Sequence, residues 1–217
     1  MVKIKICGIT NPDDARAAIE AGADMLGFNF YRPSPRFLEP QSARAIIENL
    51  RAEIGAFARK VTTAGVFVNE PSAEDVIRTA EAAGVDAIQL HGDESLSFCK
   101  ALKLIAPDHL VIKVHRVAQG FEPQEAAAYE VDAIMLDAFD KNLYGGTGRV
   151  IDWSIAHRVS ELVPRLFLSG GLSPSNVAEA IATVRPYGVD ACSALESSPG
   201  RKDVERLKAF VRAARGE

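Results

Sequence analysis

Several features are scarce or missing in this sequence of 217 residues, and each absence excludes a class of protein. Only three cysteines occur, Cys7, Cys99 and Cys192, and none of them has a metal-site spacing such as C-x-x-C. This small, odd set argues against a disulfide scaffold, so we expect a cytoplasmic protein without a bound metal. No apolar run is long enough to cross a membrane, and the stretch MVKIKICGIT is too short and too mixed for a signal peptide.

An excess of positive charge is also missing, since the formal net charge is −4. Nucleic acid is therefore not an expected partner. A small phosphorylated substrate remains compatible with this charge, because helix N-termini and a few arginines suffice to bind phosphate. Hydrophobic residues make up 47% and charged residues 25%, which is typical of a globular protein, and the length suits one domain over residues 1–217.

What the sequence does contain is a regular alternation of short apolar runs with Ala- and charge-rich helical segments. The predicted strands are Lys3–Cys7, Met25–Phe30, Thr63–Val68, Ala87–Leu90, Leu110–Val114, Ala133–Asp137, Arg165–Ser169 and Val189–Cys192. The predicted helices are Asp13–Ala21, Ser42–Leu50, Ser72–Ala83, Glu94–Ile105, Gln124–Tyr129, Trp153–Val163, Asn176–Val184 and Asp203–Ala214, the fifth being the weakest. Capping residues and prolines precede several helices, and a helix–Gly–apolar–Asp–strand phrase recurs at Gly22, Gly84 and Gly188.

Eight strand–helix units of about 27 residues each favour an α/β fold of the (β/α)8 TIM-barrel type over a doubly wound open sheet, which usually has fewer strands. In such barrels the chemistry lies at the C-terminal ends of the strands. Cys7, Asp137 and His91 all stand at or directly after a predicted strand end. These are the positions to examine for function.

Cys7 and Asp137 are the candidates for acid–base chemistry. A thiol acts as a general base if its pKa falls towards neutrality, whereas the alternative for Cys7 is an inert buried cysteine. Asp137 ends the run Ala-Ile-Met-Leu-Asp, where desolvation favours the protonated form that a general acid needs. Its alternative is a structural loop cap. Their strands are three places apart in an eight-stranded ring, so the two side chains should face each other across the mouth.

Three further features point to substrate binding. Arg36 can pair bidentately with a carboxylate, or it can be a solvated loop arginine. His91 can hydrogen-bond substrate or neighbouring loops, and it lacks a second ligand at metal spacing. Gly170 and Gly171, together with the segment from Ser193, follow the last two strands, where barrels of this type usually bind phosphate.

Glycines also cluster after the sixth strand, in Gly145-Gly146-Thr147-Gly148. This segment lacks the Lys-Ser/Thr of a nucleotide P-loop, so we interpret it as an active-site loop.

Read together, these segments resemble the signature set of the phosphoribosylanthranilate isomerase family, in order from residue 5 to beyond residue 200. The matching segments are Lys5-Ile6-Cys7-Gly8-Ile9-Thr10, Gly27-Phe28-Asn29-Phe30-Tyr31, Ser34-Pro35-Arg36-Phe37, Gly65-Val66-Phe67-Val68-Asn69, Gln89-Leu90-His91-Gly92-Asp93-Glu94, Leu136-Asp137, Gly145-Gly146-Thr147-Gly148, Asp152-Trp153, Ser169-Gly170-Gly171-Leu172 and Glu196-Ser197-Ser198-Pro199-Gly200.

The resemblance implies a (β/α)8 barrel that isomerises N-(5-phosphoribosyl)anthranilate by an Amadori rearrangement in tryptophan biosynthesis. It places the general base at Cys7, the general acid at Asp137 and the carboxylate-binding arginine at Arg36. The other expected substrate-binding residues are Gly170, Gly171, Ser193, His91 and Asp190. No cofactor is implied, because the substrate's own imine is the electron sink, and we expect a monomer or a homodimer.

Two departures from the family pattern are Cys192 and Ala194, where Ser and Gly are expected. Backbone contacts to phosphate tolerate both changes, and Cys192 raises the hypothesis of an oxidative cross-link to Cys7 on the adjacent strand. Two alternatives remain. Indoleglycerol-phosphate synthases are longer and use a catalytic lysine, whereas a non-catalytic phosphate-binding barrel would not need both Cys7 and Asp137.

Overall fold

A closed barrel of parallel strands forms the centre of the protein. The computed structural model describes residues 1–53, 61–138 and 151–217. The barrel strands, which pair in chain order, are β1 (Lys3–Cys7), β2 (Met25–Asn29), β3 (Thr62–Phe67), β4 (Ala87–Leu90), β5 (Leu110–Val117), β6 (Ala133–Ala138), β7 (Leu166–Leu168) and β8 (Gly188–Ala191). β1 pairs with both β2 and β8, which closes the ring and confirms the predicted (β/α)8 barrel.

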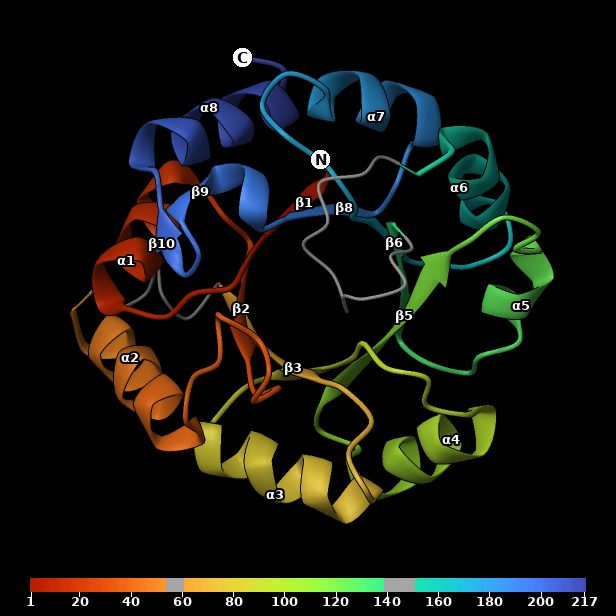
Figure 1. Cartoon of the computed structure of the whole chain (residues 1–217), viewed down its shortest axis with the longest axis horizontal. Helices are drawn as coiled ribbons and strands as arrows, with labels where there is room; N and C mark the ends of the chain where they lie inside the picture. The colour runs from red at the N-terminus through yellow and green to blue at the C-terminus, as the bar shows by residue number, and fades with distance from the viewer. Residues whose placement is uncertain (54–60, 139–150) are drawn as a thin grey trace.

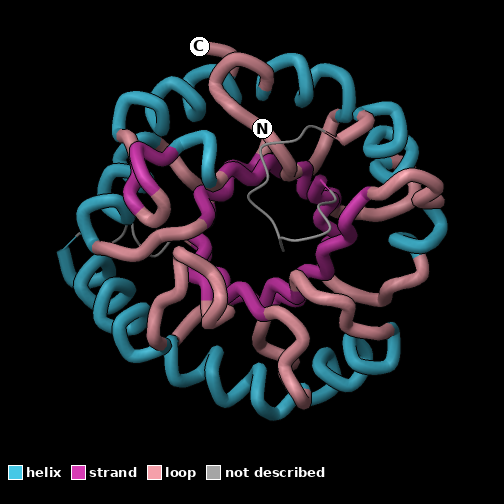
Figure 2. The backbone as a smooth tube through the Cα atoms, in the orientation of Figure 1, coloured by secondary structure: helices cyan, strands magenta, loops and turns pink. Residues whose placement is uncertain are grey.

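Helices surround this barrel as an outer ring (Figures 1 and 2). They are α1 (Pro12–Ala21), α2 (Pro40–Glu53), α3 (Ala73–Ala83), α4 (Leu96–Ile105), α5 (Pro123–Ala127), α6 (Trp153–Ser160), α7 (Val177–Val184) and α8 (Val204–Arg215). Three short elements between β8 and α8 were not predicted: the 3-10 helix η2 (Ser193–Leu195) and a ribbon of β9 (Glu196–Ser198) and β10 (Arg201–Lys202).

Local sequence signals explain where α1 and α3 begin and end. The side chains of Asn11 and Ser72 cap the two helices by accepting hydrogen bonds from backbone N–H groups of the first turn. Gly22 and Gly84 end them at φ values of 103° and 67°, in the left-handed region that favours glycine.

The third copy of the recurring phrase behaves differently, so the prediction of a helix-ending glycine at 188 is wrong. Arg185 takes the left-handed conformation after α7, at φ 52°, and Gly188 lies inside β8. A Cβ at Gly188 would lie 2.4 Å from the ring of Phe167. This glycine is therefore required by close packing between strands and not by a turn.

Aspartates that directly precede strands, two of them in the recurring phrase, connect strand ends at the N-terminal mouth of the barrel. Asp24 accepts the backbone N–H of Ile4 at 2.9 Å, and Asp86 accepts that of Thr63 at 2.8 Å. Asp132 does the same for Val111 at 2.7 Å. Each aspartate precedes one strand and binds the preceding strand, so it fixes the relative position of the pair.

Candidate active site

Five of the predicted site residues come together in one cavity of about 50 Å³ at the C-terminal ends of the strands. The cavity is lined by Cys7, Arg36, His91, Asp137 and Asp190, with Cys192 beside them. An adjoining cavity of about 20 Å³ is lined by the other three, Gly170, Gly171 and Ser193, and it shares Asp137, Asp190 and Cys192 with the first. All eight predicted residues therefore face one continuous region.

Cys7 ends β1 and lies almost fully buried, with 9% of its surface exposed. A hydrogen bond from Cys192 and the positive charge of Lys5 lower the pKa of the Cys7 thiol to about 6, against the opposing effect of burial. The same contact and burial raise the pKa of the Cys192 thiol. Cys7 is therefore the thiolate of the pair near neutral pH, and Cys192 is the donor.

Lys5, which stabilises this thiolate, belongs to a buried ion pair with Asp190. Lys5 Nζ lies 2.6 Å from Asp190 Oδ1, and both side chains are almost completely buried. Asp190 Oδ2 accepts a hydrogen bond from the Ser169 hydroxyl at 2.9 Å. Although burial alone would lower it, Asp190 and Cys7 raise the pKa of Lys5 above its usual value. Asp190, predicted to bind substrate, thus already has a partner on each carboxylate oxygen.

Asp137 lies near the end of β6 with only 3% of its surface exposed. Its Oδ1 accepts the backbone N–H of Ala138 at 2.8 Å, and its Oδ2 lies 3.1 Å from His91 Nε2. Gln89 Nε2 lies 3.0 Å from the other ring nitrogen, His91 Nδ1. With the Gln89 amide as donor, His91 carries its proton on Nε2 and donates to Asp137. The carboxyl group is therefore fixed from two sides.

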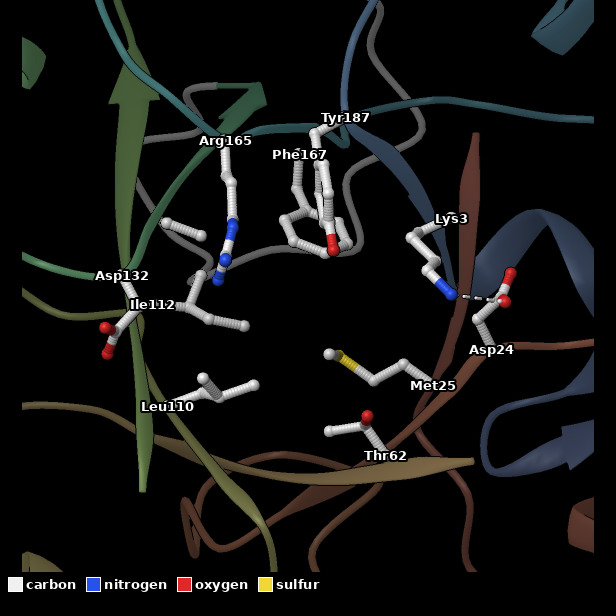
Figure 3. Close-up of a pocket in the computed structure, with 11 residues that line it drawn as sticks. Lys3, Asp24, Met25, Thr62, Leu110, Ile112, Asp132, Arg165, Phe167 and Tyr187 are labelled. Carbon is white, nitrogen blue, oxygen red and sulfur yellow. Dashed lines mark hydrogen bonds and ion pairs between the residues drawn. The ribbon is translucent and has the colours of Figure 1, made fainter. Parts of the chain in front are cut away.

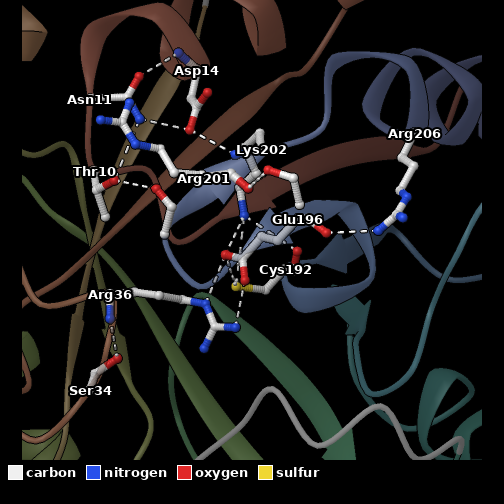
Figure 4. Close-up of polar contacts among 12 residues, drawn as sticks. Thr10, Asn11, Asp14, Ser34, Arg36, Cys192, Glu196, Arg201, Lys202 and Arg206 are labelled. Carbon is white, nitrogen blue, oxygen red and sulfur yellow. Dashed lines mark hydrogen bonds and ion pairs between the residues drawn. The ribbon is translucent and has the colours of Figure 1, made fainter.

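Arg36 reaches the cavity from the segment after β2, and its closest partner is a carboxylate of the protein itself (Figure 4). Its Nε and Nη2 donate to the two oxygens of Glu196 at 2.8 and 2.7 Å. Lys202 Nζ, fully buried, lies 3.0 Å from Glu196 Oε1. This bidentate pairing raises the pKa of Arg36. Within the described residues, Nη1 of Arg36 makes no hydrogen bond, so one edge of the guanidinium stays available.

The glycine turn after β7 is built for close approach. Gly170 and Gly171 have φ values of 82° and 67°, and a Cβ at Gly170 would lie 2.6 Å from the backbone nitrogen of Ala138. Across residues 1–53, 61–138 and 151–217, no protein acceptor binds the backbone N–H groups of Gly170, Gly171 and Ser193. Backbone N–H groups without a protein acceptor, placed together in this way, are suited to an anion.

Comparison with known proteins shows which family this chain resembles. The profile described as N-(5'phosphoribosyl)anthranilate (PRA) isomerase matches residues 4–213.

The chain belongs to the phosphoribosylanthranilate isomerase family. The N-(5'-phosphoribosyl)anthranilate isomerase of Geobacter sulfurreducens is 45% identical over 216 residues, which cover 100% of both chains. The solved phosphoribosyl anthranilate isomerase from Thermotoga maritima has 39% identity and a TM-score of 0.88, with full coverage of both chains. Another isomerase structure, in complex with reduced 1-(o-carboxyphenylamino)-1-deoxyribulose 5-phosphate, has 39% identity, full coverage of both and a TM-score of 0.84. The family prediction from the sequence motifs is thus confirmed.

Four residues of the candidate site were not predicted from the sequence as site residues. They are Lys5, Gln89, Glu196 and Lys202. Lys5 and Gln89 interrupt apolar strands, and a polar side chain in a buried strand is a signal that a partner lies nearby. Glu196 and Lys202 lie in the short β9–β10 ribbon, which has no clear period. The predicted active-site loop at Gly145-Gly146-Thr147-Gly148 lies outside the described residues.

A separate cavity, of about 80 Å³, lies at the opposite mouth of the barrel (Figure 3). Met25, Ile112 and Phe167 give it an apolar lining, and its Lys3 and Asp24 pair with each other at 3.0 Å. Cys7 and Asp137 are at the other end of the strands, so this cavity is not part of the candidate site.

Among residues 1–53, 61–138 and 151–217, no group of three His, Cys, Asp or Glu side chains is placed to hold a metal ion. No helix in these ranges combines the length and the apolar character needed to span a bilayer.

Proposed function

We propose that this chain converts N-(5-phosphoribosyl)anthranilate to 1-(2-carboxyphenylamino)-1-deoxyribulose 5-phosphate, with Cys7 as general base and Asp137 as general acid. Family membership supports the reaction, an isomerisation in tryptophan biosynthesis. One observation supports the roles above all: a thiol with a pKa of about 6 and a buried carboxyl group line the same cavity. The two groups suit proton transfer at two different atoms of one substrate.

The first step needs an acid. Asp137 protonates the ring oxygen of the sugar, and the ring opens to a Schiff base. His91 positions the carboxyl group through its hydrogen bond to Oδ2. Rotation of the Gln89 amide would place its oxygen, which makes no hydrogen bond within the described residues, on His91 Nδ1. His91 Nε2 would then accept a hydrogen bond from the carboxyl O–H of a neutral Asp137, so the trio fits both protonation states of the acid.

The second step needs a base. The Cys7 thiolate removes the proton from C2 of the sugar, and the electrons move into the imine to give an enolamine. This intermediate tautomerises to the ketone. The hydrogen bond from Cys192 and the charge of Lys5 keep Cys7 ionised before substrate arrives. The imine formed in the first step accepts the electrons, so the proposed chemistry requires no cofactor.

Binding of the substrate's two anionic groups follows from the same geometry. The backbone N–H groups of Gly170, Gly171 and Ser193 would hold the phosphate. The free Nη1 edge of Arg36 would hold the anthranilate carboxylate while Glu196 keeps the guanidinium in place. Because the phosphate contacts come from the backbone, Cys192 and Ala194 do not remove them.

We also propose that residues 1–217 act as one catalytic domain, since the family match covers residues 4–213. A monomer or a homodimer fits, since a 37% identical solved structure is of monomers generated from a dimeric isomerase of Thermotoga maritima. A reducing compartment such as the cytoplasm suits a mechanism in which Cys7 must stay a free thiolate.

The test compares steady-state isomerisation of freshly generated phosphoribosylanthranilate, followed by loss of its fluorescence, in wild type, Cys7→Ser and Asp137→Asn. Removal of an acid or base should lower kcat by about 10²- to 10⁴-fold, and circular dichroism should show both variants folded. Cys99→Ser is the matched control, because Cys99 lies in α4 away from the site.

An inactive wild type would overturn the reaction and favour a non-catalytic phosphate-binding barrel. An active wild type with one unimpaired variant would overturn the role of that residue alone.

A further inference from the structure

Cys7 and Cys192 are side by side at the ends of two paired strands. The register of β1 and β8 runs from Lys3 opposite Gly188 to Ile6 opposite Ala191, and each cysteine is the next residue of its strand. The two thiols line the same cavity, and the interaction between them lowers the pKa of Cys7 and raises that of Cys192. We propose that these cysteines form a dithiol that a peroxide oxidises to an intramolecular disulfide, which reversibly switches off the site.

The backbone geometry is compatible with such a bond. Neighbouring strands lie about 4.8 Å apart, and disulfides span Cα separations of about 4.4 to 6.8 Å. Cys192 lies just beyond the last paired residue of β8, so a small movement there breaks no hydrogen bond of the ladder. Gly8 leaves room beside the sulfur, since a Cβ at this position would lie 2.8 Å from Cys192 Sγ.

The charges around the pair assign different tasks to the two sulfurs. Lys5 stabilises the Cys7 thiolate, which makes Cys7 the sulfur that attacks the peroxide. Two charged groups lie close to Cys192 Sγ: Lys202 Nζ at 3.9 Å and Glu196 Oε1 at 3.8 Å. Glu196 is near enough to accept the Cys192 proton, and Lys202 then stabilises the second thiolate as it forms.

The chemistry balances in two steps with hydrogen peroxide as oxidant. The Cys7 thiolate attacks one peroxide oxygen and breaks the O–O bond, which gives Cys7 sulfenic acid and hydroxide. Cys192 then loses its proton and attacks the Cys7 sulfur, and the sulfenic hydroxyl leaves as water. In total, two thiols lose two protons and two electrons, and one peroxide becomes two waters. The disulfide removes the thiolate that the proposed function requires as its base.

The third cysteine provides an internal control. Burial raises the pKa of Cys99 to about 11, so it is the thiol form at neutral pH. Peroxide reacts with thiolates, and Cys99 should therefore stay reduced under conditions that oxidise Cys7.

The experiment treats the reduced, desalted protein with hydrogen peroxide and analyses a non-reducing digest by mass spectrometry. The expected product is a linked pair of peptides containing residues 7 and 192, with two hydrogens lost, in wild type and in Cys99→Ser. The same samples should lose activity in proportion to the linked fraction and regain it with dithiothreitol. Absence of this linked pair in the folded wild type would overturn the proposal.

Cys192→Ser separates a disulfide from simple oxidation of Cys7. Each protein is compared with its own untreated activity after excess peroxide and dithiothreitol. Wild type should recover, because the disulfide protects Cys7, whereas Cys192→Ser should remain inactive, because its sulfenic acid proceeds to sulfinic acid. Equal recovery of both would contradict the proposal. The activity readout rests on the proposed function, but the linked peptides do not, so failure of the isomerase assignment would leave the mass result intact.

Discussion

Two lysines on the same strand, two residues apart, have opposite surroundings. Lys3 pairs with Asp24 at 3.0 Å at the N-terminal mouth, and its side chain is 49% exposed. Lys5 pairs with Asp190 at 2.6 Å, and its side chain is 0% exposed. An exposed pair contributes little to stability, whereas a buried charge that loses its partner is strongly destabilising. The same two residue types therefore support the strand ends in one place and the chemistry in the other.

The difference extends to the two mouths of the barrel. At the N-terminal mouth, Asp24, Asp86 and Asp132 bind backbone N–H groups and lie within reach of water. At the C-terminal mouth, Asp137 and Asp190 are buried and hold side chains of the candidate site. Electrostatic interactions are stronger in the less polar surroundings of the second group. Substitutions at the two mouths should accordingly differ in size and in what they affect.

Lys5→Met should have the largest effect on stability, because it leaves Asp190 charged and buried without its partner. We expect a loss of about 3–5 kcal/mol in the free energy of unfolding, measured by urea denaturation. The double variant Lys5→Met/Asp190→Leu removes both charges and should recover much of that loss. If the single variant is as stable as wild type, the buried pair does not have the importance given to it here.

Gly170→Ala should be the next largest. The new Cβ would meet the backbone nitrogen of Ala138 at 2.6 Å, and φ is +82°. Left-handed strain and overpacking together should destabilise the protein by about 2–4 kcal/mol. Gly120→Ala is matched, with φ +86° and no heavy atom within 4 Å, and should lose only about 1 kcal/mol. Equal losses in thermal or urea unfolding would show that close packing at Gly170 is unimportant.

Arg36→Lys should weaken substrate binding more than stability, because a lysine ammonium that pairs with Glu196 has no second N–H edge to offer the substrate carboxylate. Loss of a charged hydrogen bond of about 1.5–3 kcal/mol corresponds to a rise in KM of about 10- to 100-fold. Arg32→Lys is the control, since Arg32 is 76% exposed and pairs with Glu39 at 3.4 Å. A KM that rises equally in both variants would remove Arg36 from the binding site.

Lys3→Met should have the smallest effect, below about 1 kcal/mol in the free energy of unfolding. Asp24 keeps a second cationic partner, because Arg215 Nη2 lies 2.8 Å from its Oδ2. A loss as large as that of Lys5→Met would show that the two mouths do not differ as argued.

Much of the architecture could be predicted because the information is local. Alternating apolar runs gave the barrel strands to within a few residues, and polar residues at their ends gave Cys7, Asp137 and His91. The partners of these residues could not be predicted in the same way. Arg36 and Glu196 are 160 positions apart, and Lys5 and Asp190 are 185 apart, so only the closed barrel brings them together.

The local failures have physical reasons too. β9 and β10 have three and two residues, which is too short for a period of two to be recognised. Gly188 carries the same letter as Gly22 and Gly84, yet its role is set by the ring of Phe167 on the neighbouring strand. Short length explains the first failure, and tertiary packing explains the second.

The most direct test of the central claim, that Cys7 acts as a thiolate base at the C-terminal mouth, is the pH dependence of kcat/KM. With the pKa of Cys7 lowered to about 6, thiolate is lost as pH falls below that value, so kcat/KM should fall about tenfold per pH unit there. Cys192→Ala removes the hydrogen-bond donor and should move this acid limb to higher pH, whereas Cys192→Ser retains a donor and should keep it close to wild type. An acid limb near the ordinary thiol value of 9.0 in wild type, or one that Cys192→Ala leaves in place, would contradict the account.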